Sequence, residues 1–169
     1  MIKLVGSVFI VFGCAAMGFS IALTHKRNAY ILQQFLLAVE FMLCELPEKM
    51  PPLPILLRDT AQHTSGITRQ IFLDLASILD AQEYANTELS MKTVVERYHT
   101  LPEAAKNNLL RLGQSLGRFD IPGQISGLIS IKQSVERELD ALLTNMEVRI
   151  RSYKTLGLCA GAALAILFI

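Results

Sequence analysis

Apolar residues recur every three or four positions through most of the chain, which is the spacing of helices with one buried face. No segment shows the strict alternation of apolar and polar residues that is typical of a half-buried strand. The pattern therefore predicts an all-α protein, a bundle of about six helices.

The first predicted helix is long. It is expected to run without a break from the N-terminal apolar segment to Leu46, where Pro47 ends it. The following stretch, residues 50–54 (MPPLP), is expected to form a stiff connector whose prolines open the next helix.

Turn and cap residues divide the rest of the chain. Further helices are expected over 55–63, closed by Gly66, over 67–83, and over 90–98, with Ser90 as the cap. Another begins at Leu101-Pro102, and the last begins at Asp120, whose side chain would cap a first turn containing Pro122 and Gly123.

Four of these helices carry a continuous apolar stripe, which we expect to form the core. The stripes are Leu32, Phe35, Val39, Met42 and Leu46; Ile71, Leu75, Ile78 and Leu79; Ala105, Leu109, Leu112 and Leu116; and Leu128, Val135, Leu139, Leu142, Met146, Ile150 and Tyr153.

The first helix is apolar almost all round. Ile31, Leu36, Leu37, Phe41 and Leu43 widen its stripe, and only glutamines and glutamates interrupt it. Such a helix outside a membrane is either central in the bundle or covered by a partner.

Both ends of the chain are uncharged. Residues 4–23 are 20 residues without a charge, enough for about 30 Å of helix, which matches a bilayer core. Residues 156–169 are a shorter uncharged segment, about 21 Å as a helix. We expect a transmembrane helix at 4–23, a transmembrane segment at 156–169, a short extracytoplasmic N-terminus at 1–3, and a helical domain at 24–155.

The two terminal helices are expected to form a long antiparallel hairpin, because the first and last helices both continue into uncharged ends. Small residues recur every four positions in each of them, a pattern that lets membrane helices approach closely. The predicted packing residues are Cys14, Gly18 and Ala22, and Gly157, Gly161 and Ala165.

Two kinds of processing compete with this view of the N-terminus. Ser20-Ile21-Ala22 resembles the small-residue pattern before a signal-peptidase site, but the apolar run is longer than in a typical signal peptide. Residues 11–14 (VFGC) loosely resemble a lipoprotein box at Cys14, although Phe12 is bulky where a small residue is usual. A lipoprotein anchored at Cys14 therefore remains an alternative.

The charges predict the orientation of the chain in the membrane. Lys26 and Arg27 follow the first uncharged segment, and Arg149, Arg151 and Lys154 precede the second. Since positive residues favour the cytoplasmic side, we expect the whole middle to be cytosolic and to contact membrane lipids at its basic edges. Residues 28–148 hold ten Lys and Arg against fifteen Asp and Glu, a net charge of −5, so a nucleic-acid partner is not expected.

No catalytic motif is visible. The three histidines are far apart, no cysteine neighbours them, and neither a phosphate-binding loop nor a GxSxG motif occurs. The three cysteines lie in apolar or cytosolic surroundings, so disulfides are not expected. We expect no enzyme activity, no cofactor and no metal site.

The stretch 112–124 (LGQSLGRFDIPGQ) holds the candidate site. Gly113 and Gly117 are four residues apart in a predicted helix, so they would share a face that another helix approaches closely. That helix belongs either to the bundle itself or to a partner. Arg118, Asp120 and Gln124 form a polar group beside them, read either as a cap with a surface ion pair or as a partner contact.

The same stretch resembles stage III sporulation protein AB of endospore-forming bacteria. Gly113, Leu116, Gly117, Asp120 and Gln124 match the strongest motif of that family, and the likeness extends to the N-terminal segment and to the Pro-Leu-Pro connector at 52–54. The resemblance implies a cytosolic helical domain similar to type II secretion F proteins.

The resemblance also implies a role in the assembly that joins mother cell and forespore. There the protein would be a multi-pass protein of the outer forespore membrane, facing the mother-cell cytosol. The implied partners are an ATPase of the stage III sporulation protein AA type and other membrane subunits of the channel, and a second copy of the chain is a further candidate. The hypothesis is a non-enzymatic platform, with a generic secretion or type IV pilus platform and a membrane-bound enzyme as rivals.

Overall fold

The protein was analysed as a computed structural model. It describes the backbone of residues 2–81, 86–116 and 120–168, and the side chains of Thr24, 26–81, 86–116 and 120–144. Those residues form six helices and no strands, which confirms the all-α prediction. The helices are α1 (Ile2–Lys49), α2 (Leu53–Gln62), α3 (Gly66–Asp80), α4 (Thr87–Arg97), α5 (Glu103–Ser115) and α6 (Ile121–Phe168).

The chain divides into two compact units. One consists of Met1–Arg27 together with Asp140–Ile169, and the other of Asn28–Leu139. The first unit therefore contains only the outer parts of α1 and α6. The second contains the four short helices and the inner parts of α1 and α6, and is called the bundle below.

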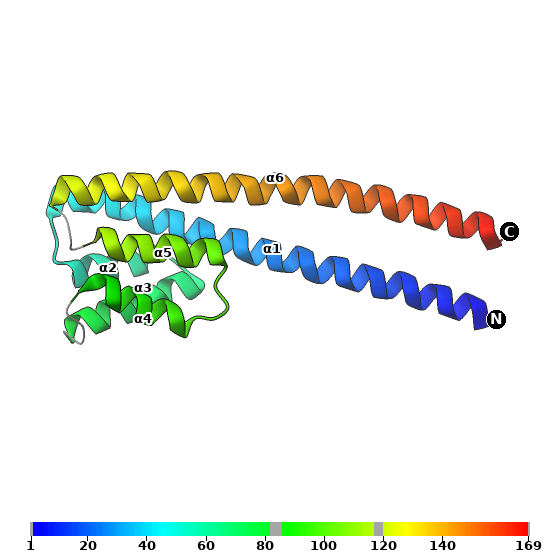
Figure 1. The fold of residues 1–169 in the computed structure, drawn as a ribbon, viewed down its shortest axis with the longest axis horizontal. Coiled ribbons are helices and arrows are strands. Elements are labelled where there is room, and N and C mark those ends of the chain that lie inside the picture. Colours follow the sequence, from blue (N-terminus) through cyan, green and yellow to red (C-terminus); the bar gives the residue numbers. More distant parts are fainter. Residues whose placement is uncertain (1, 82–85, 117–119, 169) are drawn as a thin grey trace. The chain divides into compact units, whose positions relative to one another are not determined.

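Within the bundle, neighbouring short helices pack in sequence, α2 on α3, α3 on α4 and α4 on α5. The inner parts of α1 and α6 run antiparallel there (Figure 1). An ion pair joins them, with Lys132 Nζ 2.8 Å from Glu40 Oε1. The C-terminal end of α1 and the N-terminal end of α6 thus lie at the same end of the bundle (Figure 1).

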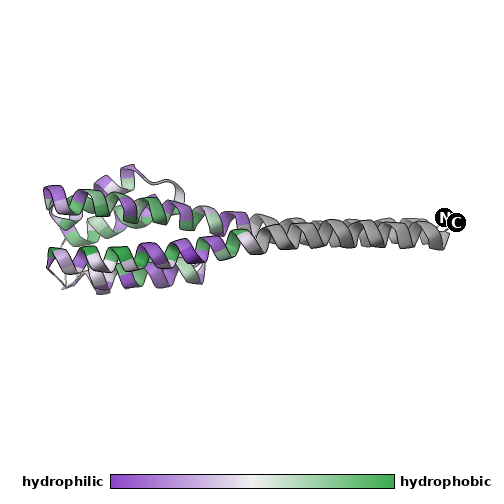
Figure 2. Ribbon diagram, turned by 90° about the horizontal axis from the view of Figure 1, so that it is seen from above, coloured by the Kyte–Doolittle hydropathy of each residue, from purple (hydrophilic) through white to green (hydrophobic). Residues whose placement is uncertain are grey.

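Most of the predicted stripe residues form the core, but Leu79 and Leu142 are only half-buried, and Met146, Ile150 and Tyr153 lie outside the residues whose side chains are described. All five stripe residues of α1 are buried, as are Ala105, Leu109 and Leu112 of α5 and Leu116 just after it. Ile71, Leu75 and Ile78 of α3 and Leu128, Val135 and Leu139 of α6 are buried too. The rings of Phe35 and Phe72 stack with their centroids 6.4 Å apart, which joins α1 to α3. Apolar and polar residues succeed one another along each of these helices (green and purple in Figure 2).

The segment Lys26–Lys49 of α1 is long and apolar enough, by length and composition, to cross a membrane. In the bundle its apolar residues instead supply much of the core, including the fully buried Leu32 and Met42. Burial against the short helices therefore explains why the Lys26–Lys49 segment is so apolar. The predicted membrane segments 4–23 and 156–169 lie in the part of α1 and α6 whose side chains are not described.

The end of α1 differs from the prediction. The helix continues through Pro47 to Lys49 and stops where Met50 adopts a positive φ of 44°. A proline in the last turn removes only one helical hydrogen bond, whereas a left-handed residue turns the chain away from the helix axis. Met50, and not Pro47, therefore ends α1.

Two cap predictions were also wrong. Gly66 does not close α2, which ends at Gln62; it opens α3 with a positive φ of 64°. The cap of α4 is Asn86, whose Oδ1 accepts from the Leu89 N–H at 2.8 Å, so α4 begins before Ser90. Ser90 is buried in the first turn, where its hydroxyl donates to the Asn86 carbonyl at 3.2 Å.

Candidate docking surface

Gly113 lies on α5 and faces α4. A Cβ added to it would lie 2.6 Å from Met91 Cβ, 3.0 Å from Met91 Cγ and 3.5 Å from the Glu88 backbone. Any side chain larger than hydrogen would push the two helices apart. Of the two explanations that the sequence left open, close packing within the bundle accounts for Gly113.

The structure does not extend α5 to the second glycine of the motif. The helix ends at Ser115, and Leu116 has extended backbone with φ −77° and ψ 129°. The expectation that Gly113 and Gly117 share one helical face concerns Gly117, which, like Arg118, lies outside the described residues, so it stays a prediction.

Asp120 starts the last helix as the sequence predicted. Its carboxylate Oδ1 accepts from the backbone N–H of Gly123 at 3.2 Å, and its carbonyl accepts from the N–H of Gln124 at 2.9 Å. The negative charge also lies at the positive end of the helix dipole. Asp120 is exposed and Gln124 is half-buried, so both belong to the surface of the first turn.

A third glycine, which sequence reasoning missed, joins α5 to α6. A Cβ added to Gly127 would overlap the Ser115 hydroxyl and lie 3.0 Å from Ser115 Cβ. The Ser115 Oγ is buried and has no hydrogen-bond partner among the described residues. The signal in the sequence was a glycine inside a predicted helix. Glycine there lowers the stability of the helix by about 1 kcal/mol relative to alanine, so its presence indicates a close approach of another helix.

Polar contacts fix the same two helices farther along. Asn108 Nδ2 donates to Glu138 Oε2 at 2.9 Å, and Arg111 donates to the hydroxyls of Ser130 and Ser134 at 3.3 and 3.4 Å. Burial raises the pKa of Glu138, while the hydrogen bond from Asn108 and the charge of Arg111 oppose that rise. These contacts, together with Gly127, hold α5 against α6.

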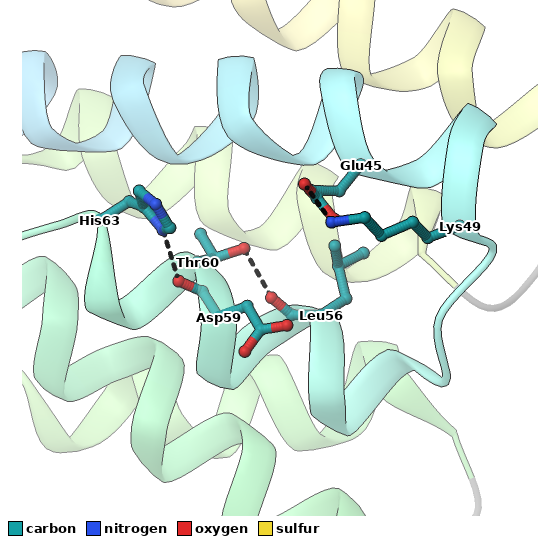
Figure 3. Close-up of polar contacts among 6 residues, drawn as sticks. All are labelled: Glu45, Lys49, Leu56, Asp59, Thr60 and His63. Atoms are coloured by element: carbon teal, nitrogen blue, oxygen red, sulfur yellow. Dashed lines mark hydrogen bonds and ion pairs between the residues drawn. The ribbon is translucent and has the colours of Figure 1, made fainter.

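Figure 3 shows polar contacts within the C-terminal end of α1 and within α2 and its cap. Lys49 Nζ donates to Glu45 Oε1 at 3.0 Å within α1, a contact that raises the pKa of Lys49. The His63 ring lies on Phe41 of α1 with centroids 4.1 Å apart. Its Nδ1 is 2.9 Å from the Asp59 carbonyl (Figure 3). The stacked rings therefore join the C-terminal end of α2 to α1.

The remaining predicted site residues, Cys14, Gly18, Ala22, Gly157, Gly161 and Ala165, are in helical parts of α1 and α6 whose side chains are not described. Their packing stays a prediction. Among the described residues, no three His, Cys, Asp or Glu side chains are arranged to hold a metal ion.

Comparison with known proteins gives one family and one solved structure. The family model described as "Stage III sporulation protein AB" matches residues 3–169, nearly the whole chain. A solved structure titled "Stage III sporulation protein AB (SpoIIIAB)" is similar to 72% of this chain and 97% of its own, with a TM-score of 0.61 and 19% sequence identity. No curated protein matches the chain.

The solved structure supports the fold alone, because the sequence identity is low. The family match is independent of it and includes the motif at 112–124 as well as both uncharged ends. The chain therefore belongs to the stage III sporulation protein AB family, a family of bacterial sporulation proteins.

Proposed function

We propose that this chain is a non-enzymatic membrane adaptor in the assembly that joins mother cell and forespore. Its bundle would dock a cytosolic ATPase of the stage III sporulation protein AA type and transmit the movement of that motor to the other membrane subunits. One observation carries the proposal. The two uncharged segments belong to one compact unit, and the bundle between them forms another.

The first unit is assigned to the membrane. It contains residues 4–23 and 156–169, and five basic residues follow or precede these segments. Two helices in one unit can enter a bilayer side by side, with the small-residue ridges of Cys14, Gly18 and Ala22 and of Gly157, Gly161 and Ala165 as their contact. The positive charges then favour a cytosolic bundle and a multi-pass protein in the outer forespore membrane.

Docking is assigned to the α5–α6 turn. Asp120 and Gln124 belong to its described part, and Gly117 and Arg118 to the adjoining residues. The cap hydrogen bond orients Asp120, and the close approach of Gly127 to Ser115 holds the start of α6 against the end of α5. Side chains that are already positioned lose little conformational freedom on binding, which suits a permanent mount. Gly113 supports this surface from within by its packing on α4.

The charge of the bundle indicates the chemistry of the partner surface. Between Asn28 and Val148 acidic residues exceed basic ones, with a net charge of −5. An exposed carboxylate at Asp120 would therefore meet a basic patch on the ATPase.

The test is co-purification of the ATPase with the intact chain from membranes of sporulating cells. Asp120→Asn keeps the cap, since asparagine caps helices as well as aspartate, but removes the charge. We expect Asp120→Asn to weaken capture and Asp120→Arg to abolish it. Glu96→Arg, an exposed charge reversal on α4, is the matched control and should bind normally.

Normal capture by Asp120→Arg would show that docking occurs elsewhere. Failure of the unaltered chain to retain any ATPase would remove the adaptor role. The topology has its own test, because protease added outside intact cells should leave residues 28–139 undigested. Digestion of that segment would show that the bundle is not cytosolic.

A further inference from the structure

Two buried side-chain atoms have no hydrogen-bond partner among the described residues, and both belong to α5. They are Asn108 Oδ1 and Ser115 Oγ. The two residues are seven positions apart, which is about two helical turns, so they lie on one side of α5. That side faces α6, because Asn108 donates to Glu138 and Ser115 lies against Gly127.

Polar contacts also join α5 to α6 between these two positions. Arg111 of α5 donates to the hydroxyls of Ser130 and Ser134 at 3.3 and 3.4 Å, which is long for such hydrogen bonds. The whole set is called the polar seam below. It consists of Asn108, Arg111 and Ser115 of α5 and of Gly127, Ser130, Ser134 and Glu138 of α6.

Other described contacts of the bundle differ from the polar seam. The buried hydroxyls of Thr60 and Ser90 each donate to the carbonyl four residues earlier, at 2.7 and 3.2 Å. The contact between α1 and α3 contains the stacked and fully buried rings of Phe35 and Phe72. Opening a contact of that kind would expose apolar surface to water, which is unfavourable.

The polar seam costs less to open. Burying a polar atom without a partner costs free energy, which is recovered when water reaches the atom. The seam has one such atom near each end, on Asn108 and on Ser115. Water can also replace the long hydrogen bonds between them. Separating α5 from α6 is therefore easier than separating helices that are joined by apolar side chains.

The α4–α5 contact is closer than the polar seam. Gly113 of α5 packs on Met91 of α4, and Gln114 Nε2 donates to Glu88 Oε1 at 3.0 Å. These contacts hold α5 to α4 without any unpartnered buried atom between them. When α5 and α6 separate, α4 and α5 therefore stay together.

We propose that the bundle opens along the polar seam. In the folded protein α6 separates from α5 and water enters between them, while the other helix contacts persist. The use of this opening rests on the proposed function. An adaptor that transmits movement needs an element that can shift, and α6 begins beside Asp120 in the proposed docking turn. The opening itself depends only on the contacts between α5 and α6.

Thiol accessibility tests the opening in the full-length chain. Cys14→Ser, Cys44→Ser and Cys159→Ser remove the three natural thiols. Asn108→Cys or Ser115→Cys then places a single reporter near one end of the polar seam. Each variant keeps the unpartnered atom at the other end. The reaction of the thiol with a maleimide is followed in vesicles, and the same reaction in urea gives the rate for the unfolded chain.

Ala76→Cys is the matched control, because Ala76 is fully buried on α3 and is not part of the polar seam. Each seam reporter should react about tenfold faster than this control in the folded protein. The added sulfur at position 76 can only loosen the core, so it works against the expected difference. Equal rates at the reporters and at the control would overturn the proposal, since exposure would then need unfolding of the whole bundle.

A change near the far end of the polar seam tests the physical cause. Glu138→Gln supplies an amide that can donate to Asn108 Oδ1, so opening gains less from water. It should slow the reaction of Ser115→Cys about threefold. Asp140→Gln, at an exposed residue of α6, should leave that rate unchanged. An unchanged rate in Glu138→Gln would overturn the proposal, because the unpartnered atom would not favour opening.

These measurements are independent of the test of the proposed function. Slow reaction of both seam reporters contradicts the opening, whatever the co-purification shows. Failure to retain the ATPase contradicts the adaptor role, whereas fast reaction of both reporters would still support the opening.

Discussion

Gly113 of α5 packs directly against the Cβ of Met91 of α4. A Cβ on Gly113 would lie 2.6 Å from Met91 Cβ, a separation that real Cβ atoms essentially never show. The distance between α4 and α5 is thus set by the absence of one side chain. Since Gly113 lies in the last turn of α5, this contact also positions the end of the helix that precedes the proposed docking surface.

Gly113→Ala should destabilise the protein, although alanine is the better helix former. The gain in helix propensity is about 1 kcal/mol, whereas overpacking a core costs about 1–3 kcal/mol. We expect a net loss of about 1 kcal/mol, measured as the shift of the urea midpoint of the purified chain. Met91→Ala should not restore stability, because the closest atom is the Cβ that alanine retains.

Asn107→Ala is the control for this measurement, because Asn107 is exposed on the same helix. It should leave stability nearly unchanged. An unaltered midpoint in Gly113→Ala would show that α4 and α5 can separate without loss, and that the glycine is not required for packing.

Ser115 and Gly127 should behave as a coupled pair. Gly127→Ala introduces a Cβ that overlaps the Ser115 hydroxyl, and we expect a loss of about 1–3 kcal/mol. Ser115→Ala alone should be neutral or stabilising, because the buried hydroxyl has no hydrogen-bond partner among the described residues. In the double variant the loss should shrink, since the overlapping oxygen is gone. Simple additivity in the double-mutant cycle would contradict the contact.

Glu138 predicts a pH dependence of stability. Burial raises its pKa in the folded protein, despite the opposing effects of Asn108, Arg111 and Arg137. The folded state therefore binds more protons than the unfolded state between the ordinary pKa and the raised one. Stability contributed by this group is greatest below the ordinary pKa and falls as pH rises through that window.

Glu138→Gln should abolish this fall, and it should be at least as stable as the unaltered chain at neutral pH. The new amide can also donate to the buried Asn108 Oδ1, which has no partner among the described residues. Urea unfolding at a series of pH values checks both points. Asp140→Gln, at an exposed position on the same helix, should leave the pH profile unchanged.

Met50→Gly should stabilise the α1–α2 turn. Met50 has a φ of 44°, and a left-handed conformation costs an ordinary residue about 1 kcal/mol that glycine avoids. We expect a gain of about 1 kcal/mol in the free energy of unfolding, seen as a higher melting temperature. Met50→Ala keeps the unfavourable φ and should bring no such gain, so equal effects of the two variants would argue against this explanation.

Helix stripes were predictable because burial follows the 3.6-residue period directly. Ala105, Leu109 and Leu112 of α5, and Leu116 just after it, are buried as predicted. Helix ends were less predictable, because several residues near each end can cap it. Asn86 and Ser90 are both good caps, and only the extended backbone at Asn86, with φ −148° and ψ 156°, decides between them.

The candidate site was predictable only in part. Asp120 could be recognised as a cap, since its role depends on the next three residues alone. Gly113 was found but its neighbour was not, because Met91 is 22 positions away and belongs to another helix. Gly127 was missed for the same reason, because its backbone lies against Ser115 only after α5 and α6 have packed.

The sequence by itself determined what depends on near neighbours along the chain: the all-helical class, the buried stripes, the cap at Asp120 and the family. The tertiary structure alone decided which helices touch, and therefore which glycines are required and which apolar residues stay exposed. Tyr30 and Leu37 read in the sequence like the other apolar residues of α1, yet each exposes 47% of its surface. They differ from Phe35 and Met42 only because the other helices bury a different side of α1, and packing between distant segments leaves no local mark in the sequence.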